Sequence, residues 1–199
     1  GLLNNLTGTP QYLSWITRKL RPHMGDTILE IGAGIGNLTG RLMGRRLRYV
    51  AGERDPLHLH ALRNRFLRTP NVEVRRLDHE SPDEFRGLEG QFDTVLCVNV
   101  LEYVAEPDPV LRSLSSVLRP GGKLLLLAPQ GEWLEGTLDE TLGHRRRFKA
   151  RDLKASLERN GFQMEWSEDL NRPGAIAWWI SSKLLRRRGL TKLTLKIFD

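Results

Sequence analysis

Short apolar runs alternate with segments of helical spacing along most of the chain. Five runs are rich in β-branched and large apolar residues, as expected for strands, at 27–32, 48–53, 72–77, 92–98 and 123–128. Apolar side chains recur about every 3.6 positions in three intervening segments, 36–43, 56–67 and 107–118. Strands that alternate with helices predict βαβ units. The predicted fold class is α/β: a Rossmann-like, doubly wound, mostly parallel sheet with helices on both faces.

Further elements are predicted on both sides of this core. Residues 10–22 have the spacing of an amphipathic helix that closes an N-terminal segment, 1–22. Residues 130–148 lack clean periodicity, and a long irregular insertion of this kind predicts a mobile lid over a site. After it, a helix is expected at 150–162, a sixth strand at 163–170 and another helix at 173–189.

The end of the chain, 191–199, alternates apolar and polar residues, as a half-buried strand does. It is either a seventh strand, or the last strand lies beyond a truncated end, which we favour. Seven basic residues against one acid give the C-terminal segment, 171–199, a charge of +6 out of a total of +7. Such an uneven charge argues against a whole-surface nucleic-acid platform and favours a local anionic partner, such as a membrane surface, or a merely soluble tail.

Length and cysteine content narrow the class of protein further. A chain of 199 residues forms a single domain with a core of its own. Its one cysteine, Cys97, excludes an intramolecular disulfide and is expected in the core. No run approaches the roughly 20 apolar residues that span a bilayer, and no signal-peptide pattern opens the chain. These features predict a cytoplasmic protein; its oligomeric state is left open.

The run ILEIGAGIGNLTGRL, residues 28–42, is the first candidate site. Gly32 and Gly34 permit a positive φ and let backbone approach a ligand, while Gly36 would let the following helix begin close to the strand. A dinucleotide fingerprint would place Gly or Ala where Asn37 stands, and no phosphate-binding lysine follows. The pattern is E-x-G-x-G-x-G, beginning at Glu30. An ordinary tight turn is the alternative.

Five motifs in order, over residues 26 to about 165, resemble the class I S-adenosylmethionine-dependent methyltransferases. They are LEIGAGIGNLT, RYVAGE, RRLDHES, FDTVLCVNVLEYV and LRPGGKLLLLAP. The resemblance implies that Glu53 grips both ribose hydroxyls of S-adenosylmethionine and that Asp78 lies near the adenine amino group. It also implies that Asn99 leaves its strand beneath the cofactor. The whole cofactor-binding set that it implies is Glu30, Gly32, Ala33, Gly34, Gly36, Asn37, Glu53, Arg54, Asp78, His79, Asn99, Val100 and Tyr103.

Simpler roles are open for several of these residues. Asp78 could cap a helix that begins near Pro82, and His79 could be exposed rather than near the adenine. His58 and His60 are expected on an exposed helix face. The five histidines and one cysteine do not cluster in metal-ligand spacing, so no metal is expected.

The segment LGHRRRF, 142–148, is similar to an LGHxRRY/F segment of bacterial methyltransferases of the methyltransferase-11/12 type, some fused to sugar transferases. His144 in it is the candidate general base, with ordering of the lid as the alternative. Arg145, Arg146 and Arg147 favour an anionic acceptor, unless they pair with Asp139 and Glu140 or are only solvated. Tyr12 and Trp133 complete the predicted acceptor site.

The resemblance predicts an enzyme that methylates a small molecule. NVLEY stands at Asn99 where adenine and glutamine N-methyltransferases have N-P-P-Y/F, which counts against those acceptors. The alternatives are an RNA-directed methyltransferase and a non-catalytic S-adenosylmethionine-binding module paired with a sugar transferase. A nicotinamide oxidoreductase is disfavoured by Asn37.

Overall fold

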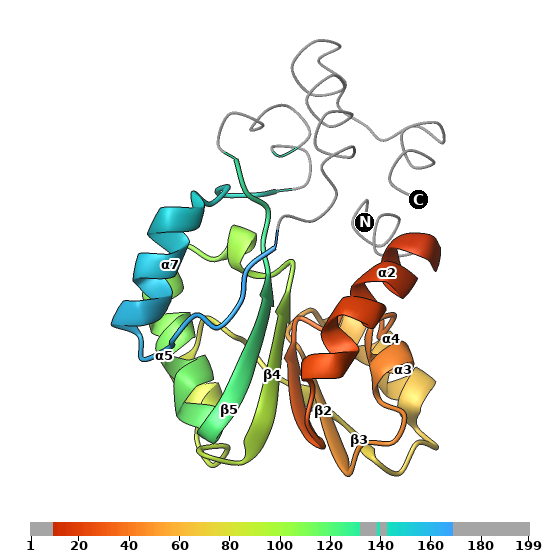
Figure 1. Cartoon of the computed structure of the whole chain (residues 1–199). Coiled ribbons are helices and arrows are strands. Elements are labelled where there is room, and N and C mark those ends of the chain that lie inside the picture. Colours follow the sequence, from red (N-terminus) through yellow and green to blue (C-terminus); the bar gives the residue numbers. More distant parts are fainter. Residues whose placement is uncertain (1–9, 132–138, 140–142, 169–199) are drawn as a thin grey trace.

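Five parallel strands form the centre of the molecule in the computed structural model, which describes residues 10–131, 139 and 143–168 (Figure 1). The strands are β1 (Thr27–Ile31), β2 (Arg48–Glu53), β3 (Val72–Arg76), β4 (Phe92–Val98) and β5 (Leu118–Leu127). Their order across the sheet is β3-β2-β1-β4-β5. The predicted doubly wound α/β fold is therefore confirmed.

The order of the strands creates one switch point in the sheet. From β1 the chain adds β2 and β3 on one side, and then returns to add β4 and β5 on the other. Ile31 of β1 pairs with Gly52 of β2 and with Cys97 of β4, so these three strands end at nearly the same level. In open α/β sheets, ligands bind at the carboxyl ends of the strands beside such a point.

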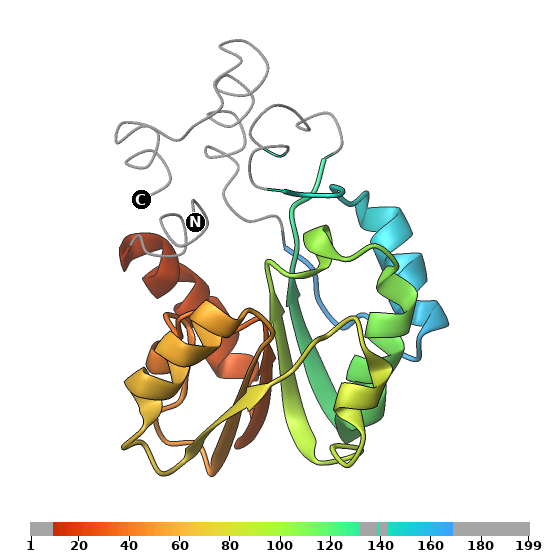
Figure 2. The ribbon, with the colours of Figure 1, turned by 180° about the vertical axis from the view of Figure 1, so that it is seen from behind.

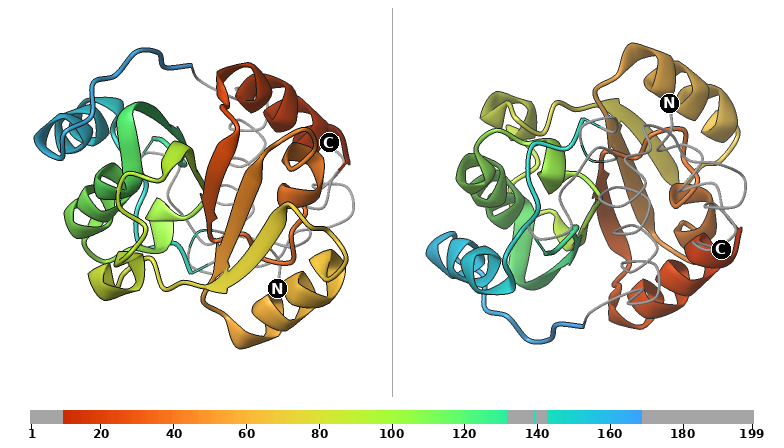
Figure 3. Two further views of the ribbon diagram at one scale, coloured as in Figure 1. Left: turned by 90° about the horizontal axis from the view of Figure 1, so that it is seen from below. Right: turned by 90° about the horizontal axis from the view of Figure 1, so that it is seen from above.

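Helices cover both faces of the sheet (Figure 2, Figure 3). On one face lie α2 (Pro10–Leu20), α3 (Thr39–Leu42) and α4 (Pro56–Phe66), and on the other α5 (Pro107–Val117) and α7 (Ala150–Arg159). Alternate strand residues supply the two cores: Ile28 packs with the first group, and Leu29 with the second. Because both faces are covered, four consecutive residues of β1, 28–31, are buried.

Among the described residues, three short 3-10 helices connect the regular elements: η1 (Arg21–His23), η2 (Pro82–Phe85) and η3 (Leu101–Tyr103). The predicted helix at 36–43 shrinks to the four residues of α3, because Gly36, with a φ of 82°, does not have a helical conformation and residues 36–38 form a turn. The start of α4 follows its sequence signal. The Asp55 side chain accepts hydrogen bonds from the amides of Leu57 and His58, and Pro56 takes the first helical position.

The predicted sixth strand is wrong over residues 163–168, which pair with no strand of the described sheet. Side chains hold this extended stretch instead: Lys123 bonds Glu165 at 2.7 Å, Lys19 bonds Glu168 at 2.8 Å, and Trp166 stacks on His23. Its alternation of polar and apolar residues is that of a strand, yet most of its side chains are exposed. The predicted helix at 173–189, the strand at 191–199 and the basic segment lie outside the described residues.

No helix within the part of the chain that the structure describes is long and apolar enough to cross a membrane.

Candidate active site

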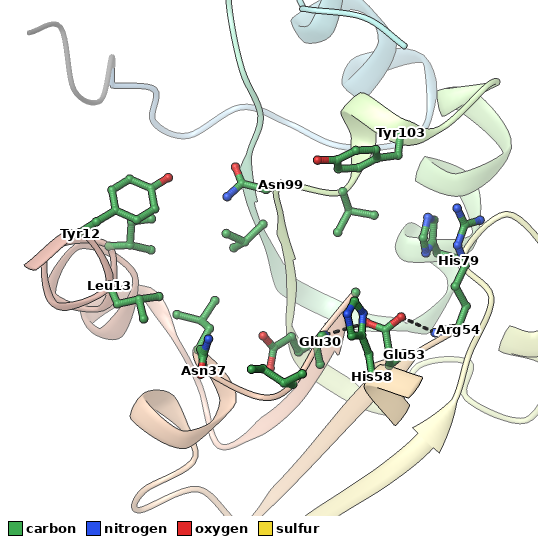
Figure 4. A pocket seen from close by; sticks show the side chains of 18 residues that line it. Tyr12, Leu13, Glu30, Asn37, Glu53, Arg54, His58, His79, Asn99 and Tyr103 are labelled. Atoms are coloured by element: carbon green, nitrogen blue, oxygen red, sulfur yellow. Dashed lines mark hydrogen bonds between the residues drawn. The ribbon is translucent and has the colours of Figure 1, made fainter. Parts of the chain in front are cut away.

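A cavity of about 280 Å³ opens at the carboxyl ends of β1, β2 and β4 (Figure 4). Its walls come from the glycine turn after β1, the end of β2, the loop after β3, the end of β4, the first turn of α4, η3, and the helix α2. The lining residues that were predicted from sequence are Tyr12, Glu30, Gly32, Ala33, Gly34, Asn37, Glu53, Arg54, His79, Asn99, Val100 and Tyr103. The fold thus gathers in one place residues that lie up to 91 positions apart.

The glycine turn has the backbone that its sequence predicts: Gly32, Gly34 and Gly36 have φ angles of 66°, 57° and 82°. Gly32 must be glycine because a Cβ there would lie 2.6 Å from the Val100 side chain. Gly34 differs, because no protein atom lies within 4 Å of the place a Cβ would take. A ligand could therefore approach the backbone at Gly34 closely.

Gly36 is not part of the cavity wall. A Cβ at this position would collide with the ring of Phe66 and come within 2.7 Å of Leu62. Both residues belong to α4, so Gly36 permits close packing of the turn against that helix rather than against the strand. Its predicted place in the cofactor site is not supported by direct contact with the cavity.

The carboxylate of Glu53 joins the end of β2 to the glycine turn. One oxygen accepts the Gly34 amide at 2.7 Å, and the other accepts the amides of Arg54 and Asp55, both at 2.8 Å. Three backbone donors hold the buried side chain in place at the cavity wall. A carboxylate can accept further hydrogen bonds on its remaining lone pairs, so it stays able to bind a ligand's hydroxyl groups.

Glu30, just before the glycine turn, is 3% exposed. The same oxygen accepts the hydroxyl of Thr39 at 2.5 Å and that of Tyr49 at 2.8 Å. Burial, with a smaller contribution from the charge of Glu53, raises the pKa of Glu30 to about 7. Glu30 thereby connects β1, β2 and α3.

The loop after β3 presents His79, not Asp78, to the cavity. Asp78 accepts the Glu80 amide and lies 3.4 Å from Arg54, which also bonds Glu80 at 2.6 Å. The capping alternative for Asp78 is wrong, since η2 has no side-chain cap. The exposure alternative for His79 is wrong as well: it is 5% exposed, and neither ring nitrogen has a hydrogen-bond partner among the described residues.

The charge state of His79 follows from these neighbours. Burial lowers the pKa of His79, and the charge of Arg54 lowers it further. The imidazole is therefore neutral at neutral pH, with one donor and one acceptor nitrogen at the cavity wall.

Asn99, Tyr12 and Tyr103 surround the other end of the cavity (Figure 4). Asn99 has a φ of 53°, which is rare for a residue with a side chain. Its backbone N–H donates to the backbone carbonyl of Leu127 at 2.9 Å. Burial raises the pKa of Tyr12, and a hydrogen bond to Asn99 partly opposes this. The hydroxyl of Tyr103 is buried without a partner among the described residues. A positive φ at a residue other than glycine, as at Asn99, is common at functional sites.

The segment 143–148 packs behind η3 rather than in the cavity wall. The backbone amide of Arg145 donates to the carbonyl of Glu102 at 2.8 Å, and the amide of Phe148 donates to the carbonyl of Pro129 at 3.0 Å. The ring of His144 meets that of Tyr103 edge-on, with centroids 5.2 Å apart. His144 itself does not line the cavity.

The three arginines of this segment have separate environments. Arg147 is buried and pairs with Asp139 at 2.9 Å. For this arginine the structure therefore has the ion pair that the sequence offered as the alternative to anion binding. Arg146 donates to the carbonyl of Ala105, and Arg145 is exposed. Trp133 and most of the predicted lid lie outside the described residues.

Sequence reasoning missed His58, which lines the cavity. It was expected on an exposed face of its helix. The Asp55 cap and Pro56 begin α4 directly after Glu53, so the first turn of the helix faces the cavity. A histidine five positions after the acid at the end of β2 was the available signal.

An open parallel sheet, a glycine turn at its switch point and a buried acid at the end of the second strand define a Rossmann-like nucleotide-binding protein. The profile of the methyltransferase domain family matches residues 29–124. A ubiquinone biosynthesis O-methyltransferase of Xanthomonas euvesicatoria is 30% identical over 175 residues, covering 78% of this chain and 70% of that protein. The chain belongs to the class I S-adenosylmethionine-dependent methyltransferases, whose cofactor is S-adenosylmethionine.

Two further relatives agree with this assignment. A ubiquinone biosynthesis O-methyltransferase of Aeromonas salmonicida is 33% identical over 123 residues, or 59% of this chain. The chain spans only about half of that protein, 49%. The crystal structure of the trans-methyltransferase CalH in complex with SAH has a TM-score of 0.57 and 28% identity, over 75% of this chain and 48% of that one.

Proposed function

We propose that this protein transfers a methyl group from S-adenosylmethionine to a hydroxyl oxygen of a small molecule. The observation that carries the proposal is the Glu53 carboxylate, held by the Gly34 amide beside a cavity at the switch point of the sheet. Two relatives carry the name O-methyltransferase, which favours an oxygen acceptor.

The residues of the cavity fit S-adenosylmethionine. The open space at Gly34 leaves room for a ligand against the backbone, and the His79 imidazole and the Tyr103 hydroxyl lack protein partners among the described residues. Buried polar groups without partners are costly, so such groups in a cavity wall are explained by a polar ligand. Glu53 would hold the ribose hydroxyls, and His79, with Asp78 behind it, the adenine.

Replacing Gly34 with alanine is expected to weaken S-adenosylmethionine binding at least about tenfold, which is about 1.4 kcal/mol. The added methyl group would occupy space at the cavity wall that no protein atom takes. Isothermal titration calorimetry measures the effect. The matched control is Gly87→Ala, because Gly87 also has a positive φ, of 78°, and open space, but lies outside the cavity. Equal affinities of the two variants would contradict the proposal.

The acceptor would enter at the end formed by Tyr12, Asn99 and Tyr103. The cofactor supplies an activated methyl group, so the protein mainly aligns the acceptor and excludes water. Tyr12 and Tyr103 provide aromatic surface and hydroxyl groups there. His144, behind Tyr103, is proposed as the base that takes the acceptor's proton. Arg145 and Arg146 stay candidates for an anionic group on the acceptor.

The function is tested by S-adenosylhomocysteine formation with a panel of phenols and alcohols, each in a neutral and a carboxylated form. We expect turnover of at least one hydroxylated compound, with faster turnover of the carboxylated form if the arginines bind an anion. Binding of S-adenosylmethionine without turnover of any compound would favour the non-catalytic module. Turnover only with RNA, lost as salt rises, would favour the RNA-directed alternative.

A further inference from the structure

Glu80, in the loop after β3, does not line the cavity but bonds to two of its walls. One carboxylate oxygen of Glu80 lies 2.6 Å from Arg54, which lines the cavity just beyond β2. The other oxygen accepts the backbone amide of Ala105 at 3.3 Å. Ala105 lies just beyond η3, whose Tyr103 lines the cavity from another side. One side chain therefore joins walls that come from separate parts of the chain.

The carboxylate of Glu80 is ionised at neutral pH. Burial raises its pKa, but the hydrogen bonds from Arg54 and from the amide of Ala105 outweigh burial and hold the pKa below its ordinary value. Hydrogen bonds to a charged group are roughly twice as strong as those between neutral groups. The side chain is 29% exposed, so solvent screens these bonds only in part. Both connections are therefore of the stronger kind.

The Arg54 end of this connection lies where the cofactor is proposed to bind. The backbone amide of Arg54 donates to Glu53, the proposed ribose ligand, at 2.8 Å. The guanidinium of Arg54 also lies 3.4 Å from Asp78, whose carboxylate accepts the amide of Glu80 at 3.1 Å. These bonds close the loop that presents His79 to the cavity (Figure 4). A ligand held by Glu53 and His79 would therefore restrict the position of Glu80.

The Ala105 end of the connection reaches the segment 143–148. The carbonyl of Ala105 accepts a hydrogen bond from Arg146. The neighbouring amide, of Arg145, donates to the carbonyl of Glu102 in η3 at 2.8 Å. Hydrogen bonds thus run from Glu80 through Ala105 to this segment, which is also bonded directly to η3.

We propose that Glu80 is a positioning residue that couples cofactor binding at the ends of β2 and β3 to the position of η3 and of the segment 143–148. This inference rests on the proposed function, since η3 carries Tyr103 at the proposed acceptor end of the cavity. With the cofactor bound, Arg54 and the loop after β3 are held in one position, and Glu80 holds Ala105 with them. The acceptor then meets a wall that is already ordered, so less conformational entropy is lost when it binds.

Hydrogen exchange tests the coupling without any acceptor. The wild type and Glu80→Ala are each saturated with S-adenosylmethionine, using the Kd that calorimetry gives for that protein, so that a change in affinity does not enter the comparison. In the wild type, the cofactor should slow exchange about threefold or more in peptides containing Gly34, Arg54, Ala105 and Arg145. In Glu80→Ala, the slowing should persist at Gly34 and Arg54 but disappear at Ala105 and Arg145.

Arg145 is the most informative position, because its amide bonds to Glu102 and not to Glu80. Glu80→Gln serves as a second variant should the alanine protein not fold. Its amide oxygen can still accept a hydrogen bond, but the charge is lost. The slowing at Arg145 should then be about half that of the wild type, since hydrogen bonds to charged groups are roughly twice as strong as neutral ones.

The matched control is Glu84→Ala. Glu84 is 25% exposed and follows the same strand, but its carboxylate pairs with Arg76 instead of with a wall of the cavity. Its removal should leave the response of every peptide to the cofactor as in the wild type. An equal loss of the Arg145 response in Glu84→Ala and Glu80→Ala would show that the effect is not specific to Glu80.

Kinetics with the fastest acceptor of the panel separate positioning from a merely structural role. Glu80→Ala should raise KM for the acceptor about tenfold or more, while KM for S-adenosylmethionine rises less than about threefold. A structural defect alone would instead lower kcat or raise both KM values together. Glu80→Gln should recover part of the loss in acceptor KM.

Three outcomes would overturn the coupling. They are equal slowing at Arg145 in the wild type and Glu80→Ala, no slowing at Arg145 in a wild type that binds the cofactor, and an equal rise of both KM values. Each of them leaves methyl transfer by the wild type intact. Failure of the wild type to bind S-adenosylmethionine or to methylate any panel member would instead overturn the proposed function, and this inference with it.

Discussion

Replacing Glu53 with alanine is expected to raise the Kd for S-adenosylmethionine by on the order of 100-fold to 10,000-fold. The carboxylate is proposed to accept two ribose hydroxyls, and each hydrogen bond to a charged group contributes about 1.5–3 kcal/mol. A second effect adds to the loss, because the Gly34 amide would lose its acceptor and with it the conformation of the turn. Isothermal titration calorimetry measures the change in affinity.

The control for this prediction is Glu73→Ala. Glu73 is a carboxylate of the neighbouring strand β3, exposed and paired with Arg48 at 2.8 Å, and it does not line the cavity. Its removal should leave cofactor affinity unchanged. Thermal unfolding of both variants separates lost affinity from lost stability. A folded Glu53→Ala protein with wild-type affinity would show that the ribose assignment is wrong.

Replacing Glu30 with glutamine is expected to remove about 3 kcal/mol of pH dependence from the free energy of unfolding. Burial raises the pKa of Glu30 from 4.5 to about 7, so between these values the folded state binds more protons than the unfolded state. The wild type therefore loses stability as the pH rises through this window. Glutamine cannot ionise, and its carbonyl can accept the hydroxyls of Thr39 and Tyr49 as the carboxyl oxygen does.

The measurement is urea unfolding of both proteins at pH 4 and pH 8. The free energy of unfolding of Glu30→Gln minus that of the wild type should be about 3 kcal/mol larger at pH 8 than at pH 4. The buried Glu102, with a pKa raised by burial to about 8, contributes a similar slope in both proteins and cancels in the difference. Glu73→Gln, at an exposed site, should show no such change. Parallel pH profiles of Glu30→Gln and the wild type would refute the prediction.

The strands and most helices follow local signals, which is why the sequence predicted them. The predicted strands at 27–32 and 48–53 are buried over residues 28–31 and 49–53, and Asp55 with Pro56 marks a helix start by local hydrogen bonding and fixed φ. The prediction of a sixth strand was wrong because strand formation depends on a partner strand as well as on the local pattern. Alternation at 163–168 needs a sheet edge to pair with, and these residues bond to Lys19 and Lys123 by side chains instead.

Gly36 and His58 show the same limit within the site. The sequence predicts that Gly36 needs no side chain, but the neighbour that forbids one, Phe66, lies 30 positions away on α4. His58 appears on a polar helix face, and only the docking of α4 beside β2 turns that face toward the cavity. Arg147 is one of three consecutive arginines, and its burial and its pairing with Asp139 distinguish it from the other two.

The sequence by itself determined the class of fold, the glycine turn and the acid at the end of β2, because strand periodicity, positive φ and the ends of parallel strands depend on short-range order. Only the tertiary structure decided that His79 rather than Asp78 lines the cavity, that Glu30 ties three elements together, and that Asp139 meets His144 and Arg147. Those relations depend on distances between side chains from separate elements. Such distances are set by the packing of helices on the sheet, which no local pattern encodes.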